Sequence, residues 1–150
     1  MKLNFHWNDS KNINQVDLIS HPGNKELLLT LETYLNKDRT LLVTHPSSGK
    51  HQVILINDIE SITALGHLSK VTLKSQDSFF YSKRLKELTF LESFNLVQIN
   101  QSTLINLQEI KLFQTEKYAR IELITKSNQH YMVSRHYAKT IKEKLLCSNN

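Results

Sequence analysis

The stretch HYMVSRHYAKTIKEKLL, residues 130–146, changes from strand periodicity to helix periodicity within a few residues. Its first part alternates apolar and polar side chains, and the final helix is expected to begin near Arg135. Arg135 offers a planar fork of donors for a base edge or a phosphate, and further basic side chains follow at Lys139, Lys142 and Lys144. This arrangement suits a polyanion, although many globular domains also end in a lysine-rich helix whose charges are only solvated.

The excess positive charge of the chain is confined to the same C-terminal region. The 150 residues carry a formal net charge of +5. Residues 1–40 hold five basic and five acidic side chains, residues 41–110 hold six of each, and residues 111–150 hold eight basic against three acidic. An acidic partner is therefore expected at the C-terminal end, and a charge of this size fits either nucleic acid or an anionic membrane surface.

Length and cysteine usage limit the kind of protein. A chain of 150 residues is long enough for one domain with a buried core plus a small appendage. Cys147 is the only cysteine, so no disulfide can form within the chain and a reducing compartment is expected. No apolar run approaches the roughly 20 residues of a membrane span, and the N-terminal residues lack the apolar stretch of a signal peptide. We therefore expect a cytoplasmic protein.

Residues 1–40 are predicted to form a small β-β-α appendage. Apolar and polar side chains alternate over residues 2–8 and 15–20, which predicts a β-hairpin. Asn24 is placed to cap a helix that ends near Lys37. Apolar side chains recur along this helix at helical spacing: Leu27, Leu28, Leu31, Tyr34 and Leu35. This stripe is expected to be buried, either on the main domain or in a dimer contact.

The pattern of residues 41–150 is mainly β, and we predict one domain there, of the α+β class with short helices. Runs that predict strands are found at residues 41–44, 52–56, 59–63, 71–74, 79–81, 96–99, 104–107, 109–114, 118–125 and 130–133. Ser82 is placed to cap a short helix. That helix has three leucines on one face: Leu85, Leu88 and Leu91. The strand at residues 118–125 is expected to turn three apolar side chains to one face: Ala119, Ile121 and Leu123.

Sequence signatures of catalysis and of metal binding are absent. The three glycines are too far apart for a dinucleotide fingerprint or a phosphate-cradling loop, and SSGK at residues 47–50 is interpreted as a hairpin turn. The seven histidines show neither a two-histidine helical spacing nor a nearby cysteine pair. No serine lies in a nucleophile-elbow pattern. We therefore predict a protein without enzymatic activity, metal or cofactor.

Three segments carry a recognisable set of features in a fixed order: INDIESITALGHLSKVTLKS (residues 56–75), LVQINQSTLINLQEI (96–110) and YMVSRHYAKTIKEKL (131–145). The features are an acidic strand before a glycine loop, a short LKEL helix, a serine followed by an aliphatic-asparagine pair, and a valine-serine-arginine strand that enters a helix. The residues are Asp58, Ile59 and Glu60 with Gly66 and His67, then Leu85 to Leu88, Ser102 with Ile105 and Asn106, and Val133 to Tyr137. Over residues 41–146 the chain resembles the LytTR DNA-binding domain of bacterial transcription regulators.

The resemblance implies a largely antiparallel β domain that sends loops from one side into successive major grooves of duplex DNA. It implies base contacts from three loops: His67 with Lys70, Gln101 with Ser102, and Arg135 with His136. Arginine can bind guanine, and glutamine adenine, through two hydrogen bonds, and each such pair contributes about 1–3 kcal/mol of discrimination. Nearby basic side chains would contact phosphates and set affinity and register: Lys83, Arg84, Lys139 and Lys142.

Several of these assignments have alternatives that the residues leave open. His67 could be an ordinary loop histidine, and His136 a helix-start residue without a ligand. Gln101 and Ser102 could cap the segment that follows them. The chain also departs from the family's usual pattern, which has a basic or histidine residue ahead of the serine and an asparagine-aromatic pair after the loop glycine. Those positions here are Asn100-Gln101 and His67-Leu68, which affects the expected target sequence.

The resemblance also implies partners. Double-stranded promoter DNA and a second copy of the chain are expected, and short family members are often paired with a small inhibitory membrane protein. The first forty residues are too few for the phosphoacceptor receiver domain that many relatives carry. The alternative from another functional class is a protein-interaction module of the same fold without DNA readout, which would work through the leucine-rich helix at residues 25–36.

Overall fold

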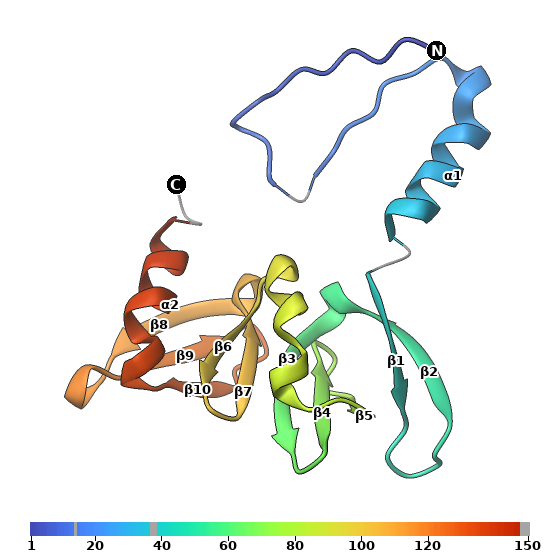
Figure 1. The fold of residues 1–150 in the computed structure, drawn as a ribbon. Helices are drawn as coiled ribbons and strands as arrows, with labels where there is room; N and C mark the ends of the chain where they lie inside the picture. The colour runs from blue at the N-terminus through green and yellow to red at the C-terminus, as the bar shows by residue number, and fades with distance from the viewer. Residues whose placement is uncertain (14, 37–38, 148–150) are drawn as a thin grey trace. The chain divides into compact units, whose positions relative to one another are not determined.

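The computed structural model describes residues 1–13, 15–36 and 39–147 (Figure 1). The chain divides into two compact units, Met1–Lys37 and Asp38–Asn150.

The first unit contains one helix, α1 (Lys25–Asn36), which follows a single 3-10 turn, η1 (Pro22–Asn24). The predicted helix is thus confirmed. The 3-10 turn before it is capped by His21, whose Nδ1 accepts a hydrogen bond from the Gly23 N–H at 3.1 Å. Asn24, the predicted cap, directly precedes α1, and its side chain donates to Ser20 Oγ at 2.8 Å.

The hairpin predicted at residues 2–8 and 15–20 is wrong for the described residues, which contain no strand there. The apolar side chains that suggested it lie in solvent, and Trp7 is 90% exposed. Alternation specifies which face of a strand is apolar, but a two-stranded hairpin is marginal in water unless that face packs on another surface. In this unit no described residue is buried, so that surface is missing.

The second unit is built of antiparallel strands, as predicted. Its described strands are β1 (Thr40–Thr44), β2 (His51–Leu55), β3 (Ile59–Leu65), β4 (Leu68–Leu73), β5 (Ser78–Tyr81), β6 (Leu96–Asn100), β7 (Thr103–Asn106), β8 (Ile110–Thr115), β9 (Ile121–Thr125) and β10 (His130–Val133). Seven form a sheet in the order β2-β1-β5-β4-β3-β7-β6, and three form a sheet in the order β10-β9-β8. Helix α2 (Arg135–Cys147) begins at the residue that the sequence predicted.

Two hydrophobic cores meet at the β6–β7 hairpin, which has an apolar side chain on each of its faces. Leu96 and Leu104 belong to the core of the larger sheet. Val97, Ile99 and Ile105 belong to the core that the smaller sheet shares with α2. Successive residues of a strand point to opposite faces, so a strand between two cores needs apolar residues on both of its faces.

The segment between β5 and β6 forms two short 3-10 helices, η3 (Leu85–Glu87) and η4 (Thr89–Phe94). The predicted leucines are buried: Leu85, Leu88 and Leu91. The predicted cap at Ser82 is wrong, because the first turn begins three residues later. There, Glu87 Oε2 accepts a hydrogen bond from the Arg84 backbone N–H at 2.8 Å and closes the N-terminus.

The strand predicted from residue 118 begins at Ile121. Tyr118 and Ala119 have left-handed backbone angles, with φ of 62° and 57°, and lie in the short turn η6 (Lys117–Ala119). Extended pairing cannot continue through such a conformation. Ala119 is consequently exposed, whereas Ile121 and Leu123 are buried on one face as expected.

A buried carboxylate joins the two sheets. Glu60 on β3 is 1% exposed and accepts hydrogen bonds from Gln76 Nε2 and Ser127 Oγ, each at 2.6 Å, and from the Tyr131 hydroxyl at 3.3 Å. Tyr131 also lies 3.0 Å from Ser61 Oγ. Burial raises the pKa of Tyr131, and the nearby Glu60 carboxylate acts in the same direction. Residues from both sheets therefore depend on one acceptor.

Replacing this acceptor is expected to destabilise the second unit. Glu60→Ala removes the acceptor that Gln76, Ser127 and Tyr131 share across the two sheets, and the free energy of unfolding should fall by about 2 kcal/mol in urea titrations. Glu92→Ala, which removes an exposed carboxylate with one surface ion pair, is the control and should change it by less than about 1 kcal/mol. Equal losses in the two variants would show that the Glu60 cluster does not hold the sheets together.

Candidate nucleic-acid interface

Three chain reversals lie at one end of the second unit. Gly66, at φ +62°, begins the turn between β3 and β4, and Gln101 and Ser102 form the turn between β6 and β7. Strands β3 and β7 are neighbours, and the Ala64 N–H donates to the Ser102 carbonyl at 2.8 Å. Figure 1 shows these two turns pointing the same way. The third reversal, the β10–α2 junction at Ser134, is tied to β6 by a bond from the Ser134 N–H to the Ile99 carbonyl at 2.9 Å.

Asn100 fixes the second and third reversals to each other. Its Oδ1 accepts from the Ser102 backbone N–H at 2.9 Å and from Ser102 Oγ at 3.1 Å. Its Nδ2 donates to the Met132 carbonyl at 3.1 Å, just before β10 ends. Gln98 Nε2 in turn donates to the Asn100 carbonyl at 3.0 Å. Because one amide uses both of its ends within the protein, Asn100 is a structural brace and not a free reading group.

All seven residues predicted to contact DNA are exposed: His67, Lys70, Gln101, Ser102, Arg135, His136 and Lys139. Within the described part of the chain, neither the Arg135 guanidinium nor the Gln101 amide has a side-chain partner. Groups that read base edges need free donors and acceptors on a fixed backbone. Arg135 and Gln101 meet this requirement, because the backbone next to each is held by the bonds around Asn100.

Helix α2 separates its side chains into a buried face and a basic stripe. Ala138, Ile141 and Leu145 are buried in the second core. Arg135, Lys139 and Lys142 lie at spacings of four and three residues, so they follow one side of the helix and are all exposed. The stripe is an extended line of positive charge that begins at the third reversal. Charge of this kind neutralises phosphates.

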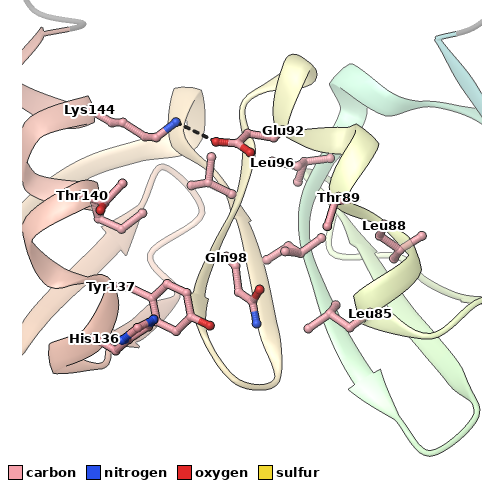
Figure 2. A pocket seen from close by; sticks show the side chains of 13 residues that line it. Leu85, Leu88, Thr89, Glu92, Leu96, Gln98, His136, Tyr137, Thr140 and Lys144 are labelled. Carbon is pink, nitrogen blue, oxygen red and sulfur yellow. Dashed lines mark hydrogen bonds and ion pairs between the residues drawn. The ribbon is translucent and has the colours of Figure 1, made fainter.

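Lys144 does not belong to this stripe, contrary to the first interpretation of the C-terminal lysines. Its Nζ lies 3.0 Å from Glu92 Oε1 on η4, and this ion pair spans a groove between α2 and the 3-10 helices (Figure 2). The groove has a volume of about 340 Å³. Its floor includes Leu88, Leu96 and Ile141, which are buried core residues.

His136 lies at the rim of the same groove and packs edge-on against Tyr137, with ring centroids 4.8 Å apart and planes at 86° (Figure 2). It is one residue from Arg135, and one residue turns a helix by about 100°. The two adjacent side chains therefore leave the helix in different directions. His136 shares its side with Thr140 and the paired Lys144, not with the basic stripe.

The first reversal carries His67, whose ring is already in contact with the protein. His67 Nδ1 lies 2.5 Å from a terminal nitrogen of the Arg84 guanidinium. Lys70 is exposed on β4, paired in register with Phe80 of β5, and Lys83 precedes Arg84 on the segment that leaves β5. His67 and Lys70, predicted for the first loop, therefore lie near Lys83 and Arg84, which were predicted to contact phosphates.

Two further observations concern other kinds of site. Among residues 1–13, 15–36 and 39–147, no three histidine, cysteine or acidic side chains are grouped so that they could hold a metal ion. Neither helix in this part of the chain has the length and apolar character that a membrane crossing requires.

Comparison with known proteins identifies the class of the domain. The profile of the LytTr DNA-binding domain family matches residues 49–146. A LytTr DNA-binding domain from Bacillus cereus has a similar fold, with a TM-score of 0.63 and 16% sequence identity, over 72% of this chain and 96% of that domain. No curated protein sequence gives a significant match. The fold is therefore that of a β-rich DNA-binding domain, and the chain belongs to the LytTR family, which confirms the predicted fold class and resemblance.

The brace at Asn100 was not among the predicted site residues. The sequence showed a polar corner at residues 100–103, but not that an amide there bonds to Met132, 32 residues away. The contact between His67 and Arg84, 17 residues apart, was missed for the same reason. The signal available in the sequence was an asparagine directly before a two-residue turn, where its side chain is known to bond to the backbone two residues on.

Removal of the brace is expected to loosen two reversals without unfolding the domain. In Asn100→Ala, the amides of Ser102 and Ser134 should exchange with deuterium faster, and affinity for a selected duplex should fall about tenfold, the equivalent of one or two hydrogen bonds. The control is Ser75→Ala, which removes the hydroxyl that braces the β4–β5 turn at the other end of the sheet through Asp77, at 2.8 Å. If both variants lose the same affinity, Asn100 has no special role at the interface.

Proposed function

We propose that this protein is a sequence-specific, non-enzymatic DNA-binding regulator of transcription whose three reversals enter successive major grooves of promoter DNA. The observation that carries the proposal is the set of exposed polar tips held at one end of the domain by hydrogen bonds between them. Membership of a DNA-binding family supports the choice of DNA as the acidic partner. The Arg135 side chain has no protein partner within the described residues, while the backbone beside it is held by hydrogen bonds. This combination supports reading of bases over nonspecific attraction to phosphates.

The side chains divide by chemistry into two groups. Arg135 and Gln101 have the planar donor and acceptor sets that distinguish bases in the major groove, and His67 and Ser102 supply single hydrogen bonds beside them. Lys70, Lys83, Lys139 and Lys142 would contact phosphates and set affinity and register. His136, on the groove side of α2, is assigned to the sugar-phosphate backbone next to the third reversal.

The proposed role of Arg135 is tested by salt-dependent binding to a duplex enriched from a randomised library. Arg135→Ala should weaken binding to the preferred duplex by about 1–3 kcal/mol and weaken binding to a scrambled duplex less. Lys139→Ala should weaken both duplexes alike and lower the slope of log affinity against log salt by about one. Fluorescence anisotropy at several salt concentrations measures all of these quantities.

Lys126→Ala is the matched control for lost charge. Lys126 is exposed in the turn between β9 and β10. This turn precedes β10, whereas Ser134 follows the other end of the same strand. Its loss should leave binding nearly unchanged. If Lys126→Ala weakens binding as much as Arg135→Ala, or if the preferred and scrambled duplexes respond alike to Arg135→Ala, the proposed reading face is wrong.

We further propose that α1 joins two protomers on the DNA. Several leucines of this helix are between 39% and 54% exposed: Leu27, Leu29, Leu31 and Leu35. Residues 1–40 carry balanced charge, so two copies would not repel each other. A pair of protomers on one face of the duplex requires half-sites whose centres are separated by about 10 bp or a multiple.

Substitution of the leucine face tests this pairing. Leu31→Glu should convert a dimer into a monomer in light-scattering measurements, because it places a charge in an apolar contact. Affinity for a single half-site should stay the same while affinity for a paired site falls. Thr30→Glu, on a neighbouring exposed position, controls for the added charge. A protein partner lost through Leu28 and Leu31 substitutions, in a chain that reads no DNA, would instead favour the interaction-module function.

A further inference from the structure

The contact between Arg84 and His67 limits what the first reversal can recognise. We propose that Arg84 is a positioning residue that holds the His67 imidazole as its Nε2–H tautomer, so that this tip offers a hydrogen-bond donor and selects bases with an acceptor. The inference rests on the proposed function, because it concerns how the same tip reads DNA. It assigns Arg84 a role beyond contact with phosphate.

The backbone that carries Arg84 is fixed on both sides. Before it, Ser69 Oγ donates to the Lys83 carbonyl at 2.7 Å, and Ser69 is fully buried in β4. At Arg84 itself, the backbone N–H donates to Glu87 Oε2 at 2.8 Å. After it, Leu85 is buried in the first core. The guanidinium therefore extends from a rigid segment toward the β3–β4 reversal. There it lies 2.5 Å from His67 Nδ1.

The chemistry of the two groups determines the tautomer. A guanidinium has five N–H donors, no acceptor, and no accessible neutral form. A ring nitrogen in hydrogen-bond contact with it must be the acceptor, so His67 Nδ1 carries no proton. A neutral imidazole keeps one ring proton, which then lies on Nε2.

The consequence for DNA follows from the pattern of the major groove. Guanine offers acceptors at N7 and O6, adenine at N7 and thymine at O4, whereas cytosine offers only the N4 donor. A His67 ring that only donates can bind the first three and not cytosine. Lys70, on the strand that follows, likewise has donors and no acceptor. The first reversal therefore favours guanine, which has two acceptors, while the Gln101 amide of the second reversal can both donate and accept.

The first arm of the test uses the protein alone. Long-range proton–nitrogen correlation spectra of the histidine ring at neutral pH report which nitrogen carries the proton. The wild-type chain should show His67 as the Nε2–H form, and Arg84→Met should shift the ring toward a mixture of both forms. Lys83→Met removes the same charge from the adjacent exposed residue and should leave the ring unchanged. Identical His67 spectra for wild type and Arg84→Met, or a proton on Nδ1 in the wild type, would overturn the proposal.

The second arm uses a duplex selected by the wild-type chain, in which each purine in turn is replaced by its 7-deaza analogue and each thymine by 4-thiothymine. One replacement should weaken wild-type binding about five- to tenfold, the value of a single hydrogen bond, and the loss should disappear in His67→Ala. Lys83→Met should keep this sensitivity and Arg84→Met should lose most of it. Equal sensitivity in Arg84→Met and Lys83→Met would reduce Arg84 to a phosphate contact and refute its positioning role.

The two arms separate failure of this inference from failure of the proposed function. If the wild-type chain selects no duplex, the proposed function fails, and the recognition rule fails with it whatever the ring spectra show. A second outcome is that a duplex is selected and Arg135→Ala weakens binding to it, but Arg84→Met leaves the tautomer of His67 unchanged. In that case the proposed function stands and only the inference about Arg84 fails.

Discussion

The β6–β7 hairpin lies between the two hydrophobic cores of the domain and packs against both of them. Its residues alternate between two hydrophobic cores, with Leu96 and Leu104 in one and Ile99 and Ile105 in the other. A strand pair buried on both faces cannot slide or tilt without opening one of the cores, because a shift of one residue exchanges the faces. The turn at its end is therefore held by packing against both cores. The buried Glu60 carboxylate adds a polar link between the same two sheets.

A few hydrogen bonds connect this turn to the neighbouring chain reversals. Asn100 connects the β6–β7 turn to the end of β10, and Ser102 connects it to the end of β3. Arg84 extends the same principle from backbone to side chain by orienting His67. Arg135 and Gln101 have no side-chain partner within the described residues, and each can form two hydrogen bonds to one base edge. Rigid support under free polar groups is what sequence-specific recognition requires.

Much of this arrangement could be predicted from local patterns. Strand positions, the start of α2 at Arg135 and the buried leucines of the 3-10 helices follow from periodicity, which is a property of neighbouring residues. The failures concern information that neighbours do not contain. The N-terminal hairpin would have needed a surface to pack on. Ala119 lies in a left-handed turn, and nothing in the residues next to it indicated this. Lys144 looked like a free charge until the fold placed Glu92 beside it, 52 residues away in sequence.

If the three reversals form one reading face, chemical-shift mapping on a selected duplex should show changes at all three. Backbone amide signals of the labelled chain would be followed as the duplex is added. The largest changes are expected at residues 66–70, 101–102 and 134–139, whereas the β9–β10 turn at residues 126–129 should stay nearly unchanged. Changes concentrated at residues 126–129, or confined to one of the three reversals, would contradict it.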